Sequence, residues 1–144
     1  MDTNADILFA SDLRSTITRL VKKLRKESPT GQQLSLTERS TMAQLYTNKA
    51  MLPSELAANE MITNQSMSQV LNHLFELGYI TRTASATDGR KVNISLSEQG
   101  EHTLQQFRHE RDEWLADAIV RACTPDEQEL LKQVLVPLGK ILAI

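Results

Sequence analysis

The stretch that decides the fold runs from Thr63 to Gly100 and reads TNQSMSQVLNHLFELGYITRTASATDGRKVNISLSEQG. Its first part has a helix pattern, because apolar residues recur at steps of three and four and so share one face. That face is formed by Met67, Val70, Leu71, Leu74 and Leu77. Gly78 follows at a position where helices commonly end. The pattern therefore predicts one amphipathic helix over residues 63–78.

The opposite face of this predicted helix is unusual because its N-terminal part is uncharged. It carries Gln65, Ser68, Gln69 and Asn72, and only Glu76 near its end is ionised. Gln and Asn can make paired hydrogen bonds to adenine, and Ser can bond to several base edges. A solvated helix surface remains the alternative interpretation of the same residues.

Two short strands are predicted after the helix. Residues 79–83 are rich in β-branched and aromatic side chains, residues 84–89 have turn composition, and residues 91–96 alternate polar and apolar side chains. Arg90 and Lys91 then lie beside the tip of a β-hairpin. A helix followed by a basic hairpin fits a winged helix-turn-helix, in which the helix enters a major groove and the loop contacts the backbone or minor groove.

The chain before this stretch predicts three further helices. After a frayed end at residues 1–4, a long amphipathic helix is expected over 5–26, and Ser28 to Gly31 forms a break. A second helix begins at a cap formed by Ser35 or Thr37 and continues to about Asn48. A short third helix begins near Leu52. Its inward-facing residues are expected to be Leu56, Ala57 and Met61.

Two helices are expected after the hairpin. Ser97 caps a long one that ends near Ala122, and Thr124-Pro125 opens a very apolar one in which Pro137 should bend or break the hydrogen-bond ladder. The predicted fold class is mainly α with a small β-hairpin wing. The terminal helices are more apolar than one small domain can cover, and an exposed apolar surface of that size needs a partner.

Composition and charge limit the class of protein. The chain has 144 residues, 40% of them hydrophobic, a single cysteine, and a net charge of −2. A single domain in a reducing compartment is expected, without a signal sequence or membrane span, and hence a cytoplasmic protein. Residues 1–30 have six basic and four acidic side chains, residues 31–96 five of each, and residues 97–144 five and nine. The negative charge therefore lies away from the predicted helix over residues 63–78, which is called the reading helix below.

Several motifs between Ser35 and about Leu104 resemble the MarR family of transcriptional regulators. They are Leu36-Thr37-Glu38-Arg39, Ser54-Glu55-Leu56-Ala57, Leu74-x-x-x-Gly78-Tyr79-Ile80-x-Arg82, and Asp88-Gly89-Arg90 leading to Leu96-Ser97-x-x-Gly100. The wing motif is the most specific of these. The chain departs from the family where a glycine often precedes the Ser54 helix, since it has Lys49-Ala50-Met51-Leu52 there. It also lacks the basic residue that many members carry on the reading helix.

The resemblance implies a single unit over 1–144, with a winged DNA-binding part over 35–100 and dimerisation helices over 1–30 and 101–144. It implies a homodimeric regulator, most often a repressor, that binds a pseudo-palindromic double-stranded DNA operator and is relieved by a small aromatic or phenolic ligand. Arg90 would reach the minor groove or its phosphates, Asp88 would orient it, and Arg82 would position neighbours. The expected DNA-binding residues are Thr63, Asn64, Gln65, Ser66, Ser68, Gln69, Asn72, Arg82, Asp88, Arg90 and Lys91.

Other functions find less support in the sequence. It has no phosphate-binding glycine loop, HExxH motif or nucleophile elbow, so neither an enzyme nor a cofactor is expected. His102 and His109 share a helix face, but zinc usually needs three or four convergent ligands, so no metal site is predicted. The basic run Arg19 to Lys26 can be either a solvated helix end or a phosphate contact. The alternative function is a winged-helix module that binds a protein instead of DNA.

Overall fold

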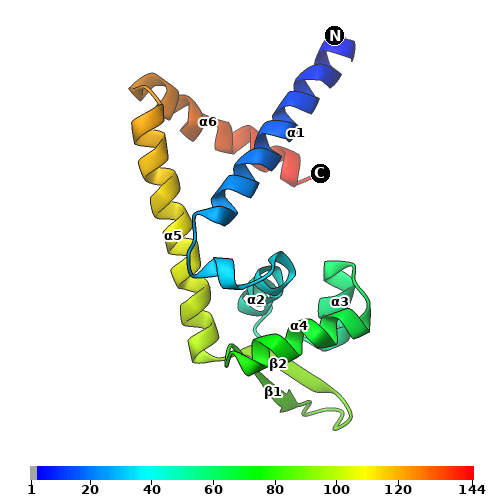
Figure 1. Ribbon diagram of the computed structural model, residues 1–144. Helices are drawn as coiled ribbons and strands as arrows, with labels where there is room; N and C mark the ends of the chain where they lie inside the picture. The colour runs from blue at the N-terminus through cyan, green and yellow to red at the C-terminus, as the bar shows by residue number, and fades with distance from the viewer. Residues whose placement is uncertain (1–2) are drawn as a thin grey trace.

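The computed structural model describes residues 3–144, which form six α-helices, one 3-10 helix and a two-stranded hairpin (Figure 1). The elements are α1 (Thr3–Lys26), η1 (Gly31–Gln33), α2 (Leu36–Asn48), α3 (Pro53–Glu60), α4 (Asn64–Glu76), β1 (Ile80–Ala84), β2 (Val92–Leu96), α5 (Glu98–Ala122) and α6 (Pro125–Leu142). This arrangement confirms the predicted fold class of a mainly helical chain with a small hairpin.

The winged part of the molecule closes its own hydrophobic core. Helices α2, α3 and α4 pack on one another and on the hairpin, and the first turns of α5 complete the cluster. Leu74 of α4 and Leu104 and Phe107 of α5 are almost fully buried there. The buried core residues are Leu34, Met42, Leu45, Met51, Leu56, Ala57, Met67, Leu71, Leu74, Ile80, Ile94, Leu104 and Phe107.

Local features fix where the helices of the winged part begin and end, as α2 and α4 show. Ser35 caps α2, because its hydroxyl accepts from the Glu38 N–H while a Glu38 carboxylate oxygen accepts from the Ser35 N–H. This reciprocal arrangement satisfies two free donors of the helix N-terminus. Gly78 follows α4 with φ of +79°, a conformation that glycine adopts at no steric cost.

The hairpin is antiparallel, with Ile80 opposite Leu96 and Ala84 opposite Val92. A bridge between Met51 and Ile94, which the sequence did not predict, adds a third segment beside β2. Its two backbone hydrogen bonds tie the α2–α3 loop to the wing. Gly100 is required where α5 begins, because a Cβ there would lie 2.0 Å from the Tyr79 carbonyl oxygen.

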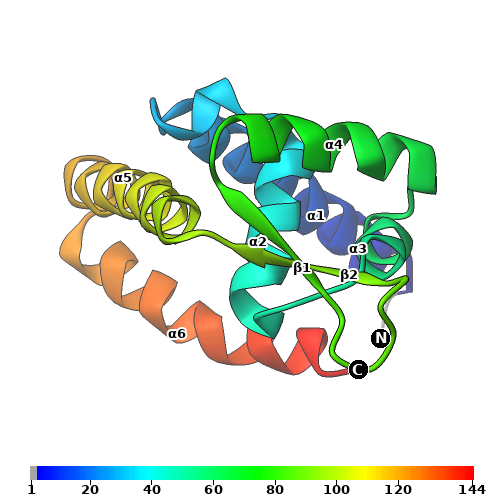
Figure 2. The same ribbon diagram turned by 90° about the horizontal axis from the view of Figure 1, so that it is seen from below.

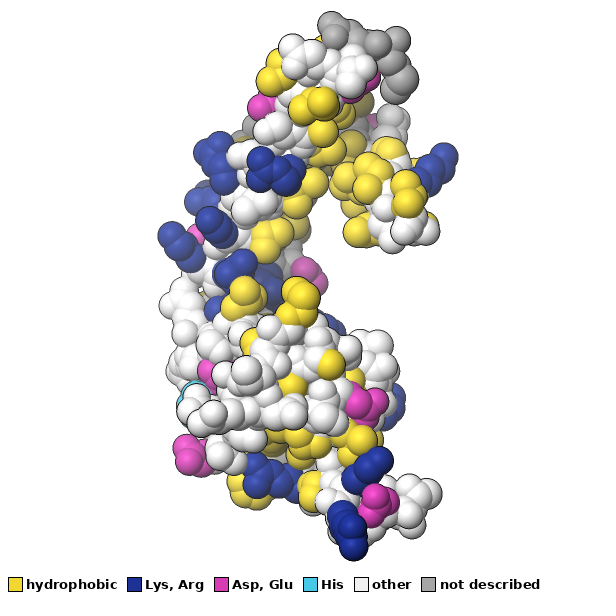
Figure 3. Space-filling view, turned by 90° about the vertical axis from the view of Figure 1, so that its right-hand side faces the viewer, with side chains coloured by type: hydrophobic (Ala, Val, Ile, Leu, Met, Phe, Trp, Pro, Cys, Tyr) yellow, Lys and Arg dark blue, Asp and Glu magenta, His cyan; other side chains and the backbone are white. Residues whose placement is uncertain are grey.

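Helices α1 and α6 leave their apolar faces uncovered in the single chain. α5 carries the chain away from the hairpin, α1 meets it near the C-terminal end of α1 and points away from it, and α6 returns across the end of the molecule opposite the wing (Figure 1). Within Thr3–Lys26 and Pro125–Leu142 none of the side chains is buried. Figure 3 shows hydrophobic side chains gathered over the part where these helices lie. They include Ile7, Leu8, Phe9, Leu130, Leu135 and Ile141.

Two expectations for local structure were wrong. Met61 faces solvent rather than the core, with 91% of its surface exposed, because it forms the left-handed cap that ends α3. α1 already begins at Thr3, inside the segment expected to fray, and residues 1–2 lie outside the described part. Pro137 lies inside α6, which continues past it to Leu142, and the bend or the gap in the hydrogen-bond ladder expected there stays a prediction. Among residues 3–144, the helices are all too short or too polar to cross a bilayer.

Candidate nucleic-acid interface

The N-terminus of α4 is an open set of backbone donors. Thr63 adopts an extended conformation before the helix, and its hydroxyl oxygen accepts from the Ser66 N–H at 3.0 Å. The Thr63 hydroxyl in turn donates to the Ser66 hydroxyl at 3.0 Å. The first N–H groups of a helix have no partner within the helix, and here Asn64 and Gln65 supply them. Such a terminus can bind a phosphate, since the free amides and the helix dipole both favour an anion.

The outer face of α4 presents the amide and hydroxyl groups that the sequence predicted. Gln65, Ser68, Gln69 and Asn72 are exposed, while Met67 and Leu71 on the other face are buried. The Ser68 hydroxyl donates to the Asn64 carbonyl at 3.0 Å, so its oxygen remains available as an acceptor. The side-chain amides of Gln65 and Gln69 have no hydrogen bond to other side chains or backbone groups of residues 3–144, so they are free to bind a base edge.

Arg82 on β1 reaches back to α4. Its Nη2 donates to the Asn72 side-chain oxygen at 2.8 Å, and its guanidinium lies over the Phe75 ring at 4.8 Å from the centroid. Because the Asn72 oxygen is used, its NH₂ group is the part left to donate outward. The predicted role of Arg82 as a positioning residue agrees with these contacts and stays a prediction.

The loop between β1 and β2 is shaped by its own short-range hydrogen bonds. An Asp88 carboxylate oxygen accepts from the Arg90 N–H at 3.1 Å, and the Asp88 carbonyl accepts from the Lys91 N–H at 3.0 Å. The Ser85 N–H donates to the Lys91 carbonyl at 2.9 Å and closes the loop. Asp88 therefore fixes the backbone from which the exposed Arg90 and Lys91 side chains extend, and the described ion pairs include neither of them.

The helix and the wing face the same side of the molecule, as the view from below shows (Figure 2). A groove of about 420 Å³ is lined by Asn64 and Ser68 of α4 and by Arg90 and Lys91 of the hairpin. A neighbouring hollow of about 340 Å³ brings Asn72 and Arg82 together with Ser68. The predicted residues outside these two hollows are Thr63, Gln65, Ser66, Gln69 and Asp88.

The sequence interpretation missed one contact between α2 and the reading helix. His73 on α4 is exposed, and its Nδ1 pairs with a carboxylate oxygen of Glu38, which is only 8% exposed. Burial would raise the pKa of Glu38, yet hydrogen bonds from the Ser35 N–H, His73 and the Ser35 hydroxyl lower the pKa below its ordinary value of 4.5. The capping-box spacing Ser35-x-x-Glu38 was the available signal for the buried carboxylate.

The predicted absence of a metal site stays a prediction. Groups of three or more His, Cys, Asp and Glu side chains able to hold a metal ion were not found within residues 3–144. His109 instead pairs with Glu113 one turn later, at 3.1 Å.

Helices α2, α3 and α4 followed by a basic hairpin, with one face of α4 exposed, define the winged-helix class of helix-turn-helix proteins. Comparison with known proteins identifies the family within that class. A model of the MarR family matches residues 34–92. An uncharacterized HTH-type transcriptional regulator of Mycobacterium bovis is 33% identical over 129 residues, which cover 90% of this chain and 89% of that protein.

Solved structures agree with this assignment. A crystal structure described as a transcriptional regulator protein from Pseudomonas aeruginosa superposes with a TM-score of 0.83 at 28% identity, covering 99% of this chain and 98% of that one. A Staphylococcus aureus MepR mutant bound to an oligodeoxyribonucleotide shares the fold, with a TM-score of 0.70 at 20% identity and coverage of 93% and 97%. The chain belongs to the MarR family of HTH-type transcriptional regulators.

Proposed function

We propose that this protein is a homodimeric, sequence-specific DNA-binding repressor that releases its operator when a small molecule binds. The observation that carries the proposal is the groove in which Asn64 and Ser68 of α4 face Arg90 and Lys91 of the wing. An uncharged helix face next to a pair of exposed cations suits a major groove beside a phosphate backbone. The family membership supports the same function.

In this proposal the residues of α4 divide by their chemistry. Gln65, Ser68, Gln69 and the Asn72 NH₂ group read base edges, because amides and hydroxyls match the donors and acceptors of the major groove. Thr63, Asn64 and Ser66 lie at the helix N-terminus, where the free amides contact a phosphate and set the register. Arg82 holds the Asn72 side chain in place.

In the wing, Arg90 and Lys91 supply charge. Both side chains are exposed at the hairpin tip, and Asp88 holds the Arg90 backbone through its carboxylate. We place them against phosphates or in the minor groove adjacent to the major groove that α4 enters. Since residues 31–96 are neutral overall, these few cations carry most of the non-specific attraction.

The dimer is formed by residues 1–30 and 101–144. The chain exposes 10352 Å², whereas a compact protein of 16.2 kDa exposes roughly 7,500 Å². This excess of roughly 2,900 Å² is per chain and corresponds to roughly 5,800 Å² for two copies, at the upper end of the 2,000–5,000 Å² or more that the two partners of an obligate dimer bury together. The uncovered faces of α1 and α6 are the apolar part of that surface. Two copies related by a two-fold axis would present two α4 helices to half-sites about one helical turn apart.

Repression and its relief follow from this geometry. A dimer bound across a promoter excludes other proteins from it, and a ligand that favours a different separation of the two α4 helices lowers affinity for the operator. The described chain has a pocket between the terminal helices and α2 for such a ligand. We propose that the protein acts in the cytoplasm, the compartment expected from its sequence.

The experiment is a gel-shift titration of the dimer on its natural upstream DNA at several salt concentrations. Arg90→Ala should weaken binding to every probe and flatten the salt dependence, because one phosphate-neutralising charge is lost. Gln69→Ala should relax preference at particular base pairs, at a cost of about 1–3 kcal/mol there. Gln33→Ala, at an exposed glutamine of η1 outside both the proposed DNA-binding residues and the proposed dimer helices, is the matched control and should bind like the parent.

A protein-binding module remains the second candidate, favoured by the neutral charge of residues 31–96. It would use the α4 face for a protein partner. If Arg90→Ala and Gln69→Ala both bind every DNA probe like the parent, this face does not read DNA and the main proposal is wrong. Retention on DNA-cellulose followed by salt elution would separate the two candidates independently.

A further inference from the structure

The linker between α1 and α2, residues 27–35, is tied to α5 by one carboxylate, that of Glu110. The Ser28 hydroxyl donates to Oε2 of Glu110 at 3.0 Å, and the Thr30 N–H donates to the same oxygen at 3.2 Å. The Thr30 hydroxyl donates to Oε1, and this bond is the main reason why the pKa of Glu110 lies below its ordinary value of 4.5. Glu110 is therefore ionised at neutral pH and accepts three charge-assisted hydrogen bonds from the linker.

The linker is also bonded within itself and to the end of α1. The Ser28 hydroxyl accepts from the Gly31 N–H at 3.1 Å, and the Ser28 carbonyl accepts from the Gln32 N–H at 3.0 Å. The Gln32 side-chain amide donates to the Lys26 carbonyl, at the last residue of α1. A Cβ on Gly31 would lie 3.3 Å from the Cβ of Phe107, so the linker runs close against α5. It therefore joins the carboxylate on α5 to α1 as one short, rigid unit.

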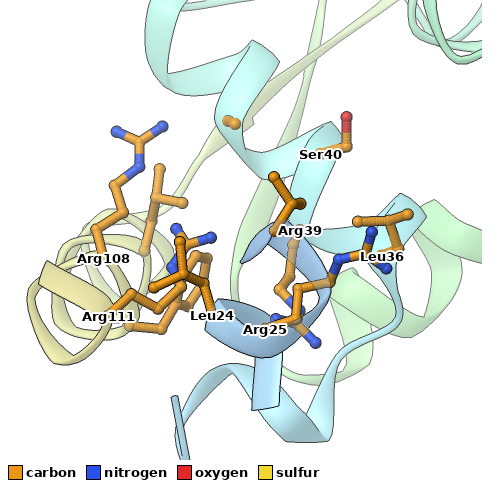
Figure 4. A pocket seen from close by; sticks show the side chains of 11 residues that line it. Leu24, Arg25, Leu36, Arg39, Ser40, Arg108 and Arg111 are labelled. Atoms are coloured by element: carbon orange, nitrogen blue, oxygen red, sulfur yellow. The ribbon is translucent and has the colours of Figure 1, made fainter. Parts of the chain in front are cut away.

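Packing between α1 and α5 does little to fix the direction of α1. A pocket of about 290 Å³ lies between α1, α2 and α5 (Figure 4), and none of the side chains of α1 is buried. Val21 and Leu24 of α1 line this pocket. The Lys23 ammonium lies over the Trp114 ring, 5.4 Å from its centroid, a contact that restrains direction only weakly. The linker is therefore the main fixed point of α1 in the described chain.

Like charges around the pocket also oppose close packing of these helices. Arg25 of α1, Arg39 of α2 and Arg111 of α5 surround it (Figure 4). Burial lowers the pKa of the Arg39 guanidinium, and the charges of Arg111 and Arg25 lower it further. Arginine keeps its proton at neutral pH in spite of such shifts, so the three side chains repel one another. The hydrogen bonds to Glu110 hold the junction of α1 and α5 together against this repulsion.

α1 is long and is held at one end, so a small change at the linker is amplified. Its 24 residues make it about 36 Å long, at about 1.5 Å per residue. A tilt of about 5° at its C-terminal end moves its other end by about 3 Å over that length. In the proposed dimer α1 pairs with the second copy, so its tilt changes how the two copies meet and how far apart the two reading helices lie.

We propose that Glu110 is a positioning residue for operator recognition: its carboxylate fixes the direction of α1 relative to α5 and thereby narrows the half-site spacing that the dimer accepts. This inference rests on the proposed function, because spacing matters only when two copies bind one duplex. One added base pair moves a half-site by about 3.4 Å and turns it by about 35°. A dimer with a fixed separation of its α4 helices rejects that change, and one with a loose linker accepts it.

Three variants separate the contacts. Glu110→Ala removes the acceptor of all three linker bonds, whereas Thr30→Val removes one hydroxyl and keeps the N–H bond. Gln33→Ala is the matched control, because it truncates an exposed side chain of the same linker that has no hydrogen bond to α5 within residues 3–144. Circular dichroism and analytical ultracentrifugation check that each variant is a folded dimer. Thr30→Val carries the test if Glu110→Ala does not fold.

The first measurement needs no DNA. A spin label at Glu76→Cys, an exposed position of α4, reports the separation of the two reading helices by double electron–electron resonance in a Cys123→Ser background. Glu110→Ala should broaden the distance distribution or shift it by about 3 Å or more, Thr30→Val should do so less, and Gln33→Ala should match the parent. A residue that only stabilises the linker would lower the melting temperature and leave the distribution unchanged. A folded dimer of Glu110→Ala with the parental distribution overturns the proposal.

The second measurement is a gel-shift series on half-site spacing. The probes are built from the natural upstream DNA that the parent protects, with one base pair added or removed between the half-sites. Glu110→Ala should reduce the preference for the natural over the altered spacing about fivefold or more. Gln69→Ala should weaken binding to every probe and keep that preference, because it changes a base contact only. An unchanged preference in Glu110→Ala contradicts the proposal. If the parent binds none of the probes, the proposed function fails, and the distance measurement still decides the role of Glu110.

Discussion

The two halves of α5 lie in different surroundings, and the contrast divides the molecule. Leu104 and Phe107 in its first half are buried in the winged part, whereas none of the side chains in its second half, residues 111–122, is buried. The second half is the more apolar of the two, since it carries Trp114, Leu115, Ile119 and Val120, so composition does not explain the difference. The winged part is stabilised by its own core, and in the proposed dimer a second copy of the chain would cover the terminal helices.

The strongest prediction concerns the winged core. Leu74→Ala should lower the free energy of unfolding by about 2–5 kcal/mol, because Leu74 is fully buried between α4 and the rest of the core and its removal leaves a cavity. Urea denaturation followed by circular dichroism measures this loss. Leu36→Ala, which truncates a leucine that is 53% exposed in the same part, should cost less than about 1 kcal/mol. Equal losses for the two variants would contradict the assigned core.

A charge placed on the apolar face of the terminal helices should weaken the proposed dimer. Leu135→Asp places a charge on the apolar face of α6, where 69% of the leucine is exposed in the single chain. We expect the dimer dissociation constant to rise about 100-fold, or about 2.7 kcal/mol, because the charge would be buried between two copies. Analytical ultracentrifugation measures it, with circular dichroism as the folding check. Gln133→Asp adds the same charge off this apolar face and should leave the dimer intact. A folded Leu135→Asp protein with parental affinity would exclude this face.

A smaller effect, of opposite sign, is expected in the α2–α3 loop. Lys49 has φ of 67° and ψ of −56°, and the Ala50 N–H donates to the Asn48 carbonyl at 2.8 Å, a tight turn that strains any side chain. Lys49→Gly should stabilise the protein by about 0.5–1 kcal/mol, since relief of strain exceeds the greater chain entropy of glycine and the lost contact of Lys49 with the Tyr46 ring. Ala50→Gly, at a negative φ, should instead destabilise it. Thermal melting compares the two.

Lys49 also shows what the sequence could predict. The resemblance indicated that a glycine is common just before the Ser54 helix, and the positive φ at Lys49 gives the physical reason. Gly78 and Gly100 also have local physical reasons. Gly78 follows α4 with φ of +79°, and Gly100 has no room for a side chain against Tyr79. The positions of α4 and the hairpin were predicted from the spacing of apolar residues, which is also a property of neighbouring residues. Features set by neighbouring residues were therefore predictable.

Features that depend on distant parts of the chain were not. The bridge of Met51 with Ile94 and the pair of Glu38 with His73 join residues more than thirty positions apart. The pocket between α1, α2 and α5 is lined by Arg25, Arg39, Arg108 and Arg111, and in the sequence each of these arginines resembles an ordinary surface cation. Met61 was misassigned because helical spacing continues to predict a buried side chain after the helix has ended. Local patterns do not contain this information.

The smallest predicted effect tests how α2 is joined to α4. The hydrogen bonds of Glu38 depress its pKa in the folded protein below 4.5, so its charged form adds stability that is complete above that pH and is lost as the pH falls through the lower, folded value. Glu38→Gln keeps an oxygen for the Ser35 N–H but removes the charge facing His73. The stability difference between parent and Glu38→Gln should therefore shrink as the pH falls below about 4.5. Urea denaturation at fixed protein concentration measures it. A difference that stays constant to about pH 3 would show that the Glu38 carboxylate does not stabilise the join between α2 and the reading helix.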